Sequence, residues 1–186
     1  TPDGLTFDVG NATREALTRG HGLSDEYSNG NGSLMRILPL AFTAAGPSDI
    51  EAVSSITHAH ATSVEACLLY VAIARRLLKG QQLPEILLGL ETSTTYARLQ
   101  TLAELTEDDI RSSGYVVDTL EAALWCLLTS TSYPETVLKA VNLGDDTDTV
   151  AAVAGGLAGI IYGLEGIPDN WLAQLRHKEL LESCLF

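Results

Sequence analysis

The chain has 186 residues, with 11 Lys and Arg against 24 Asp and Glu, and a formal net charge of −13. This acid excess excludes the usual kind of nucleic-acid-binding domain, which needs a basic surface, and disfavours docking on an anionic membrane. A hydrophobic content of 46% with 19% charged residues excludes a disordered chain, and the length is typical of one domain, 1–186.

Four further features of the sequence narrow the class of protein. Aromatic residues make up only 6%, which favours closely packed helices over a β-sandwich. The three cysteines, Cys67, Cys126 and Cys184, lie far apart, so we expect a reducing, cytoplasmic compartment. Cys67 and Cys126 lie in apolar helical runs, so we expect their thiols to be buried. The longest apolar run, 150–162, is too short to span a bilayer. The chain begins at Thr1 rather than Met, so we expect a processed chain or part of a longer one.

The first unusual segment is a glycine-rich loop over 20–36, centred on Ser28-Asn-Gly-Asn-Gly-Ser33. Such a loop before a helix can turn several backbone N–H groups toward an anion. The alternative is a flexible loop followed by an ordinary helix cap. No Gly-Lys-Ser/Thr follows, so a P-loop nucleotide-binding protein is disfavoured.

Helix starts follow along the chain. Ser48 with Glu51 and Thr62 with Glu65 each have capping-box spacing, and so do Ser132 and Glu135. The second box predicts a helix that ends at Gly80, and apolar periodicity predicts others over about 117–129 and 148–162. The last is almost wholly apolar, so we expect it to be buried on all sides, with Ala and Gly allowing close approach. Strand signals are weak. An all-α fold is predicted.

A histidine pair precedes the 62–79 helix, in Thr57-His58-Ala59-His60. Residues two apart do not share a helical face, so a zinc site on a helix is disfavoured and capping or core histidines are expected.

An acidic cluster, Gly144-Asp-Asp-Thr-Asp-Thr149, opens the last apolar helix. One carboxylate there is an ordinary response to the helix dipole. Three repel one another, and a hard cation such as Mg²⁺, Mn²⁺ or Ca²⁺ would relieve that repulsion. A metal site and a solvated cap both remain open on spacing alone.

The order of four motifs is more specific than any one of them. Gly30-Asn-Gly-Ser-Leu-Met-Arg36, Thr57-His58, Ser113-Gly-Tyr-Val-Val-Asp-Thr119 and the acidic segment followed by small residues resemble the ADP-ribosylglycohydrolases, over roughly residues 5–175. The resemblance implies a compact orthogonal multi-helix bundle with a two-metal Mg²⁺ or Mn²⁺ centre. It implies hydrolysis of ADP-ribose from protein side chains or small molecules.

The resemblance also implies roles for individual residues. Asp146 and Asp148 would be catalytic and, with Thr149, would bind the metal. Asn31, Gly32 and Ser33 would contact the phosphates or a ribose, His58 would line the ribose side, and Gly114 with Tyr115 would border the adenosine end. We expect a monomer that binds ADP-ribose or an ADP-ribosylated protein.

The family also carries an N-terminal Thr-Asp-Asp-Thr-type metal segment that this sequence lacks. The alternative to an active hydrolase is therefore an inactive ADP-ribose-binding or structural protein that keeps the fold.

Overall fold

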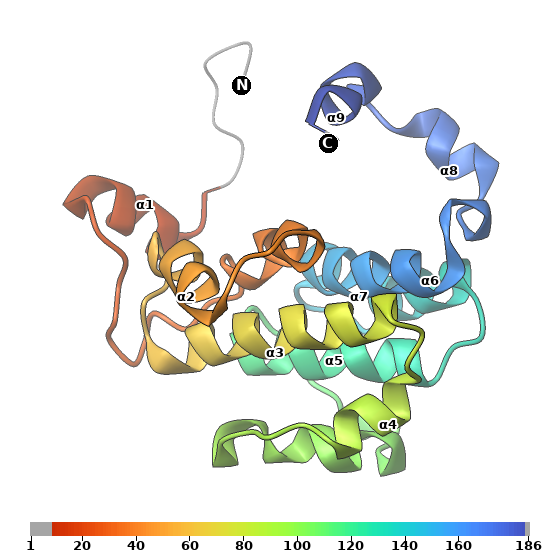
Figure 1. Ribbon diagram of the computed structural model, residues 1–186, viewed down its shortest axis with the longest axis horizontal. Coiled ribbons are helices and arrows are strands. Elements are labelled where there is room, and N and C mark those ends of the chain that lie inside the picture. The colour runs from red at the N-terminus through yellow and green to blue at the C-terminus, as the bar shows by residue number, and fades with distance from the viewer. Residues whose placement is uncertain (1–8, 185–186) are drawn as a thin grey trace.

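The computed structural model describes residues 9–184, and within them the chain is helical, with two isolated β-bridges and no strand (Figure 1). The α-helices are α1 Asn11–Arg19, α2 Pro47–Ser55, α3 Ala61–Leu78, α4 Leu83–Leu88, α5 Val116–Leu128, α6 Tyr133–Asn142, α7 Thr147–Tyr162, α8 Asp169–Gln174 and α9 Lys178–Cys184. The 3₁₀ segments are η1 Leu34–Arg36, η2 Leu38–Phe42, η3 Thr94–Glu104, η4 Glu107–Asp109 and η5 Leu164–Gly166. The predicted all-α, multi-helix fold is confirmed.

The core lies between α3, α5 and α7, which pack on one another, with α6 against α7 and α2 against α3 (Figure 1). Cys67 and Cys126 are buried free thiols, as predicted. The side chain of Cys184 lies outside what the structure describes. None of the helices within 9–184 is long and apolar enough to cross a bilayer.

Helix α7 is approached closely, as its small residues predict. A Cβ built on Gly156 would lie 2.6 Å from Leu38 Cδ2 and 3.0 Å from Tyr70 Oη, and that hydroxyl donates to Val153 O at 2.8 Å. The expectation that α7 is buried on all sides is wrong, however. Ala152 is exposed and Ile161 is 44% exposed, because no residue of the described chain covers that side of the helix.

Two of the three predicted capping boxes are wrong. Helix α2 begins at Gly46, whose N–H donates to Asp49 Oδ2 at 2.7 Å. Helix α3 is capped by His60, whose Nδ1 accepts from Thr62 N at 3.2 Å. Glu65 instead accepts from the backbone N–H and hydroxyl of Ser93, both at 2.7 Å.

The third box is half right. Ser132 is the N-cap of α6 and its hydroxyl accepts from Glu135 N at 3.3 Å, but the Glu135 carboxylate accepts from Thr131 rather than from the cap residue. A distant donor at α3 and a neighbouring donor at α6 therefore displaced the local partner of the carboxylate.

Candidate functional site

The glycine-rich loop is tied to the start of α5 through its backbone. Asn31 N donates to Gly114 O at 3.1 Å, and Val116 N donates to Asn29 O at 2.9 Å. These bonds form the antiparallel bridge between Gly30 and Tyr115. Two of the predicted motifs, 85 or so residues apart, thus become one surface.

The start of α7 joins the same surface. Asp146 N donates to Ser112 O at 3.0 Å, and Ser112 Oγ donates to Gly144 O at 3.0 Å. The Asn31 amide nitrogen then donates to Asp146 Oδ2 at 2.7 Å. A Cβ on Gly114 would stand 3.3 Å from that oxygen, so a glycine there leaves the carboxylate its room.

His58 lies behind the loop rather than in an open cleft. It is 2% exposed, and Thr57 Oγ1 lies 2.7 Å from its Nδ1. A Cβ on Gly32 would meet its Cε1 at 2.9 Å, and one on Gly30 would meet its Nε2 at 3.5 Å. Burial, with a smaller contribution from the Arg36 charge, lowers the pKa of His58 to about 4, so the ring is neutral at pH 7.

Arg36 anchors the far end of the loop. Its guanidinium donates to Gly32 O at 2.7 Å and to Val53 O and Ser54 O at 3.0 and 3.3 Å. Ser33 is fully buried and its hydroxyl accepts from Cys67 Sγ at 3.5 Å. Any contact of Ser33 with a ligand would therefore go through its backbone N–H.

The acidic cluster does not converge. Asp145 is exposed and takes a left-handed conformation, φ 53, while Asp146 is half-buried and Asp148 exposed. Within 9–184 no group of three or more His, Cys, Asp or Glu side chains is placed to hold a metal ion.

The donor set can still be tested for its fit to a cation. Asp146, Asp148 and Thr149 offer only oxygen atoms, which suits Mg²⁺ or Mn²⁺. Thr149 is 5% exposed and lies one turn after Asp146. The residues fit such an ion in chemical type, and they amount to part of a coordination shell.

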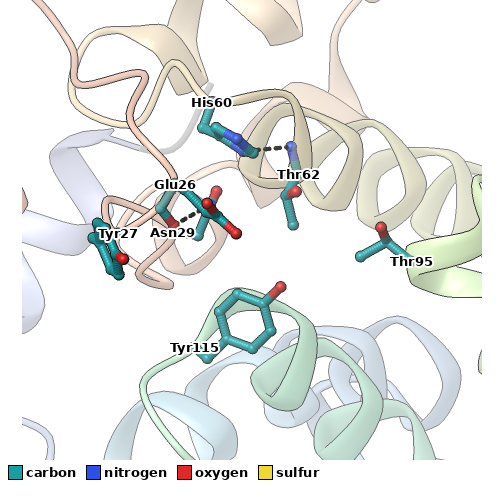
Figure 2. A pocket seen from close by; sticks show the side chains of 7 residues that line it. All are labelled: Glu26, Tyr27, Asn29, His60, Thr62, Thr95 and Tyr115. Atoms are coloured by element: carbon teal, nitrogen blue, oxygen red, sulfur yellow. Dashed lines mark hydrogen bonds between the residues drawn. The ribbon is translucent and has the colours of Figure 1, made fainter.

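A pocket of about 510 Å³ opens beside the loop, on the side of Tyr115, lined by Glu26, Tyr27, Asn29, His60, Thr62, Thr95 and Tyr115 (Figure 2). Of the predicted site residues only Tyr115 lines it. Figure 2 shows the Tyr115 ring facing the loop and His60 across the opening. His58 and His60 thus confirm the expectation of a core and a capping histidine.

Sequence reasoning missed Glu26, Tyr27 and Thr95 as lining residues. A signal for the first two existed in Asp25, whose carboxylate accepts from Tyr27 N at 3.1 Å and from Ser28 Oγ at 2.7 Å and so shapes the turn. Thr95 comes from a distant segment, and no local pattern points to it.

Known proteins that are similar to this chain in sequence and in structure point to one family. The family model described as ADP-ribosylglycohydrolase matches residues 1–185. An ADP-ribosylarginine hydrolase, Tri1, of Pseudomonas putida is 38% identical over 203 residues, covering 99% of this chain and 55% of that protein. The ADP-ribosyl-[dinitrogen reductase] glycohydrolase of Rhodospirillum rubrum is 32% identical, covering 92% and 61%.

The solved structure of an ADP-ribosylglycohydrolase-related protein complex superposes with a TM-score of 0.78 and 33% identity, covering 94% of this chain and 66% of that one. The chain spans about half the length of the curated relatives it matches.

Proposed function

The chain belongs to the ADP-ribosylglycohydrolase family, and we propose that its protein hydrolyses the glycosidic bond between ADP-ribose and a modified protein side chain or small molecule. Water adds to the anomeric carbon of the ribose, the bond to the side chain breaks, and the side chain leaves with a proton. An arginine-linked ADP-ribose is the first substrate to test, because two of the relatives are named ADP-ribosylarginine hydrolases.

The observation that carries the proposal is the 2.7 Å bond between Asn31 and Asp146 Oδ2. It joins the glycine-rich loop to the start of α7 across 115 residues of chain. It brings the glycine-rich loop and a carboxylate at a helix start to one place, as cleavage of a pyrophosphate-bearing glycoside would require.

Free backbone donors in the glycine-rich loop are the evidence that it would bind a pyrophosphate. The backbone N–H groups of Gly30, Gly32 and Ser33 donate to no group within residues 9–184. Three free donors in one loop can hold phosphate oxygens without lysines, which agrees with the acidic composition of the chain. Neutral His58 packs against the loop and would hold its shape on the ribose side.

The pocket beside the loop would take the adenosine end. Its aromatic rings, Tyr27 and Tyr115, can stack on a flat base, and the Glu26 carboxylate can accept from an exocyclic amine (Figure 2). Gly114 lies between this pocket and Asp146, so a single ADP-ribose would run from Tyr115 past the loop to the acidic segment.

Asp146, Asp148 and Thr149 would hold Mg²⁺ or Mn²⁺, with further ligands from water or from other residues. Bound there, such an ion supplies Lewis-acid stabilisation of the charge that develops as the glycosidic bond breaks. The carboxylates of Asp146 and Asp148 would be catalytic because they would hold the positively charged ion beside the reacting ribose.

The test measures ADP-ribose released from an ADP-ribosylated arginine protein by the full-length protein, with Mn²⁺ or Mg²⁺ added. Asp146→Ala with Asp148→Ala should lower the rate by about 1,000-fold or more, because Lewis-acid stabilisation contributes several kcal/mol. A matched control, Glu104→Ala with Asp108→Ala, removes two exposed carboxylates elsewhere and should leave the rate unchanged.

Unchanged turnover in the Asp146/Asp148 variant would refute the proposal. Binding of ADP-ribose by calorimetry without any release would favour the alternative, an inactive member that keeps the fold and the ligand site.

A further inference from the structure

We infer that Asn31 is a positioning residue that holds the carboxylate of Asp146 in the orientation needed to bind a divalent cation. The inference rests on the proposed function. The resemblance alone would place Asn31 among the groups that contact ADP-ribose. The structure shows its amide engaged elsewhere, with Nδ2 donating to Asp146 Oδ2 at 2.7 Å and to Thr119 Oγ1 at 2.9 Å.

The chemistry of the neighbours decides which way the amide points. The Thr119 hydroxyl donates its hydrogen to Ser113 O at 3.0 Å, so toward Asn31 it can only accept. An ionised carboxylate also only accepts. Both neighbours therefore require the nitrogen of the amide, and each of its two hydrogens has one partner.

Asn31 itself has little freedom to move. It is 9% exposed, its backbone N–H donates to Gly114 O at 3.1 Å and its carbonyl accepts from Met35 N at 3.1 Å. The amide is thus a donor fixed in place before any ligand arrives. Burial makes the loss of such a donor costly for the acceptor that depends on it.

Asp146 is held at the other end in the same way. Its backbone N–H donates to Ser112 O at 3.0 Å, and one carboxylate oxygen is occupied by Asn31. The other oxygen, Oδ1, has no hydrogen-bond partner within residues 9–184. Outer hydrogen bonds of this kind orient ligating carboxylates and tune their affinity for metal. Oδ1 is the atom left to face a cation.

The arrangement couples the two halves of the site. Asn31 sits between Gly30 and Gly32, whose backbone N–H groups are free, and its side chain holds Asp146. The glycine-rich loop and the Asp146 carboxylate are therefore linked, and an ion and an ADP-ribose bound there would each favour the geometry that the other needs.

The experiment measures the dissociation constant of Mn²⁺ by electron paramagnetic resonance in the full-length protein, together with the melting temperature of the metal-free protein. Asn31→Ala should weaken Mn²⁺ binding by about 10- to 100-fold, as loss of an outer-shell partner does, and should change the spectrum of the bound ion. Thr119→Val leaves the bond to Asp146 in place and should give a smaller loss. Asn142→Ala, which removes an exposed amide at the end of α6, should change neither the dissociation constant of Mn²⁺ nor the spectrum of the bound ion.

Asn31→Leu keeps a similar volume without a donor and is the second variant should Asn31→Ala fail to fold. A lower melting temperature with an unchanged Mn²⁺ constant and spectrum would show a merely structural role and overturn the inference alone. A wild-type protein that binds no Mn²⁺ would overturn the inference together with the proposed metal centre.

Discussion

A side chain at position 32 is predicted to destabilise the loop by collision with His58. In Gly32→Ala the new Cβ would lie 2.9 Å from His58 Cε1 and 3.4 Å from its Nε2. The ring cannot move away easily, because it is 2% exposed and its Nδ1 is held by Thr57 Oγ1. Overpacking of this kind costs about 1–3 kcal/mol, while the loss of glycine freedom in the unfolded chain returns about 0.4–1 kcal/mol.

The expected net change in the free energy of unfolding is a loss of about 1–2 kcal/mol, measured by urea denaturation, with a melting temperature lower by about 2–8 °C for a domain of this size. Gly159→Ala is the matched control, since nothing lies within 4 Å of its Cβ position, and it should stabilise α7 by about 0.5–1 kcal/mol. In a His58→Ala background, Gly32→Ala should cost less than it does in the wild-type protein. If Gly32→Ala instead stabilises the protein as Gly159→Ala does, His58 does not pack tightly against Gly32 and the reasoning is refuted.

Two further predictions concern the groups that support the loop. The pKa of His58 is about 4 in the folded protein against an ordinary 6.5, so the unfolded chain takes up the proton first as the pH falls. The free energy of unfolding should therefore fall between about pH 6.5 and pH 4, by about 3 kcal/mol more in the wild-type protein than in His58→Gln. Urea titrations at several pH values that give the same pH dependence for the wild-type protein and the variant would contradict this. Arg36→Met should lower the free energy of unfolding by about 2–3 kcal/mol in urea denaturation and weaken ADP-ribose binding, because it leaves the carbonyls of Gly32, Val53 and Ser54 without their donor. A loss of stability without any change in ADP-ribose affinity would show that the loop is not part of the binding site.

Much of the helical framework could be predicted from local pattern. The apolar repeats over 64–78 and 117–128 lie on α3 and α5, and Gly80, with φ 78, follows the end of α3 as expected. The short polar helix α1 and the small helix α4 carry no comparable periodicity and were not predicted. Cap assignments were less secure, because a capping carboxylate such as Glu65 can be claimed by a donor far along the chain, here Ser93.

The sequence by itself determined the helical class, the residue types available for chemistry and the order of the four motifs. Helical periodicity and cap chemistry depend on neighbours within a few residues, which is why these could be derived from the chain alone. Only the tertiary structure decided which polar group each of those residues meets. The Asn31 amide donates to Asp146, the Ser33 hydroxyl accepts from Cys67, and His58 packs behind the glycines. Those pairings span from about 26 to 115 residues of chain, and they depend on how the packed helices bring distant loops together.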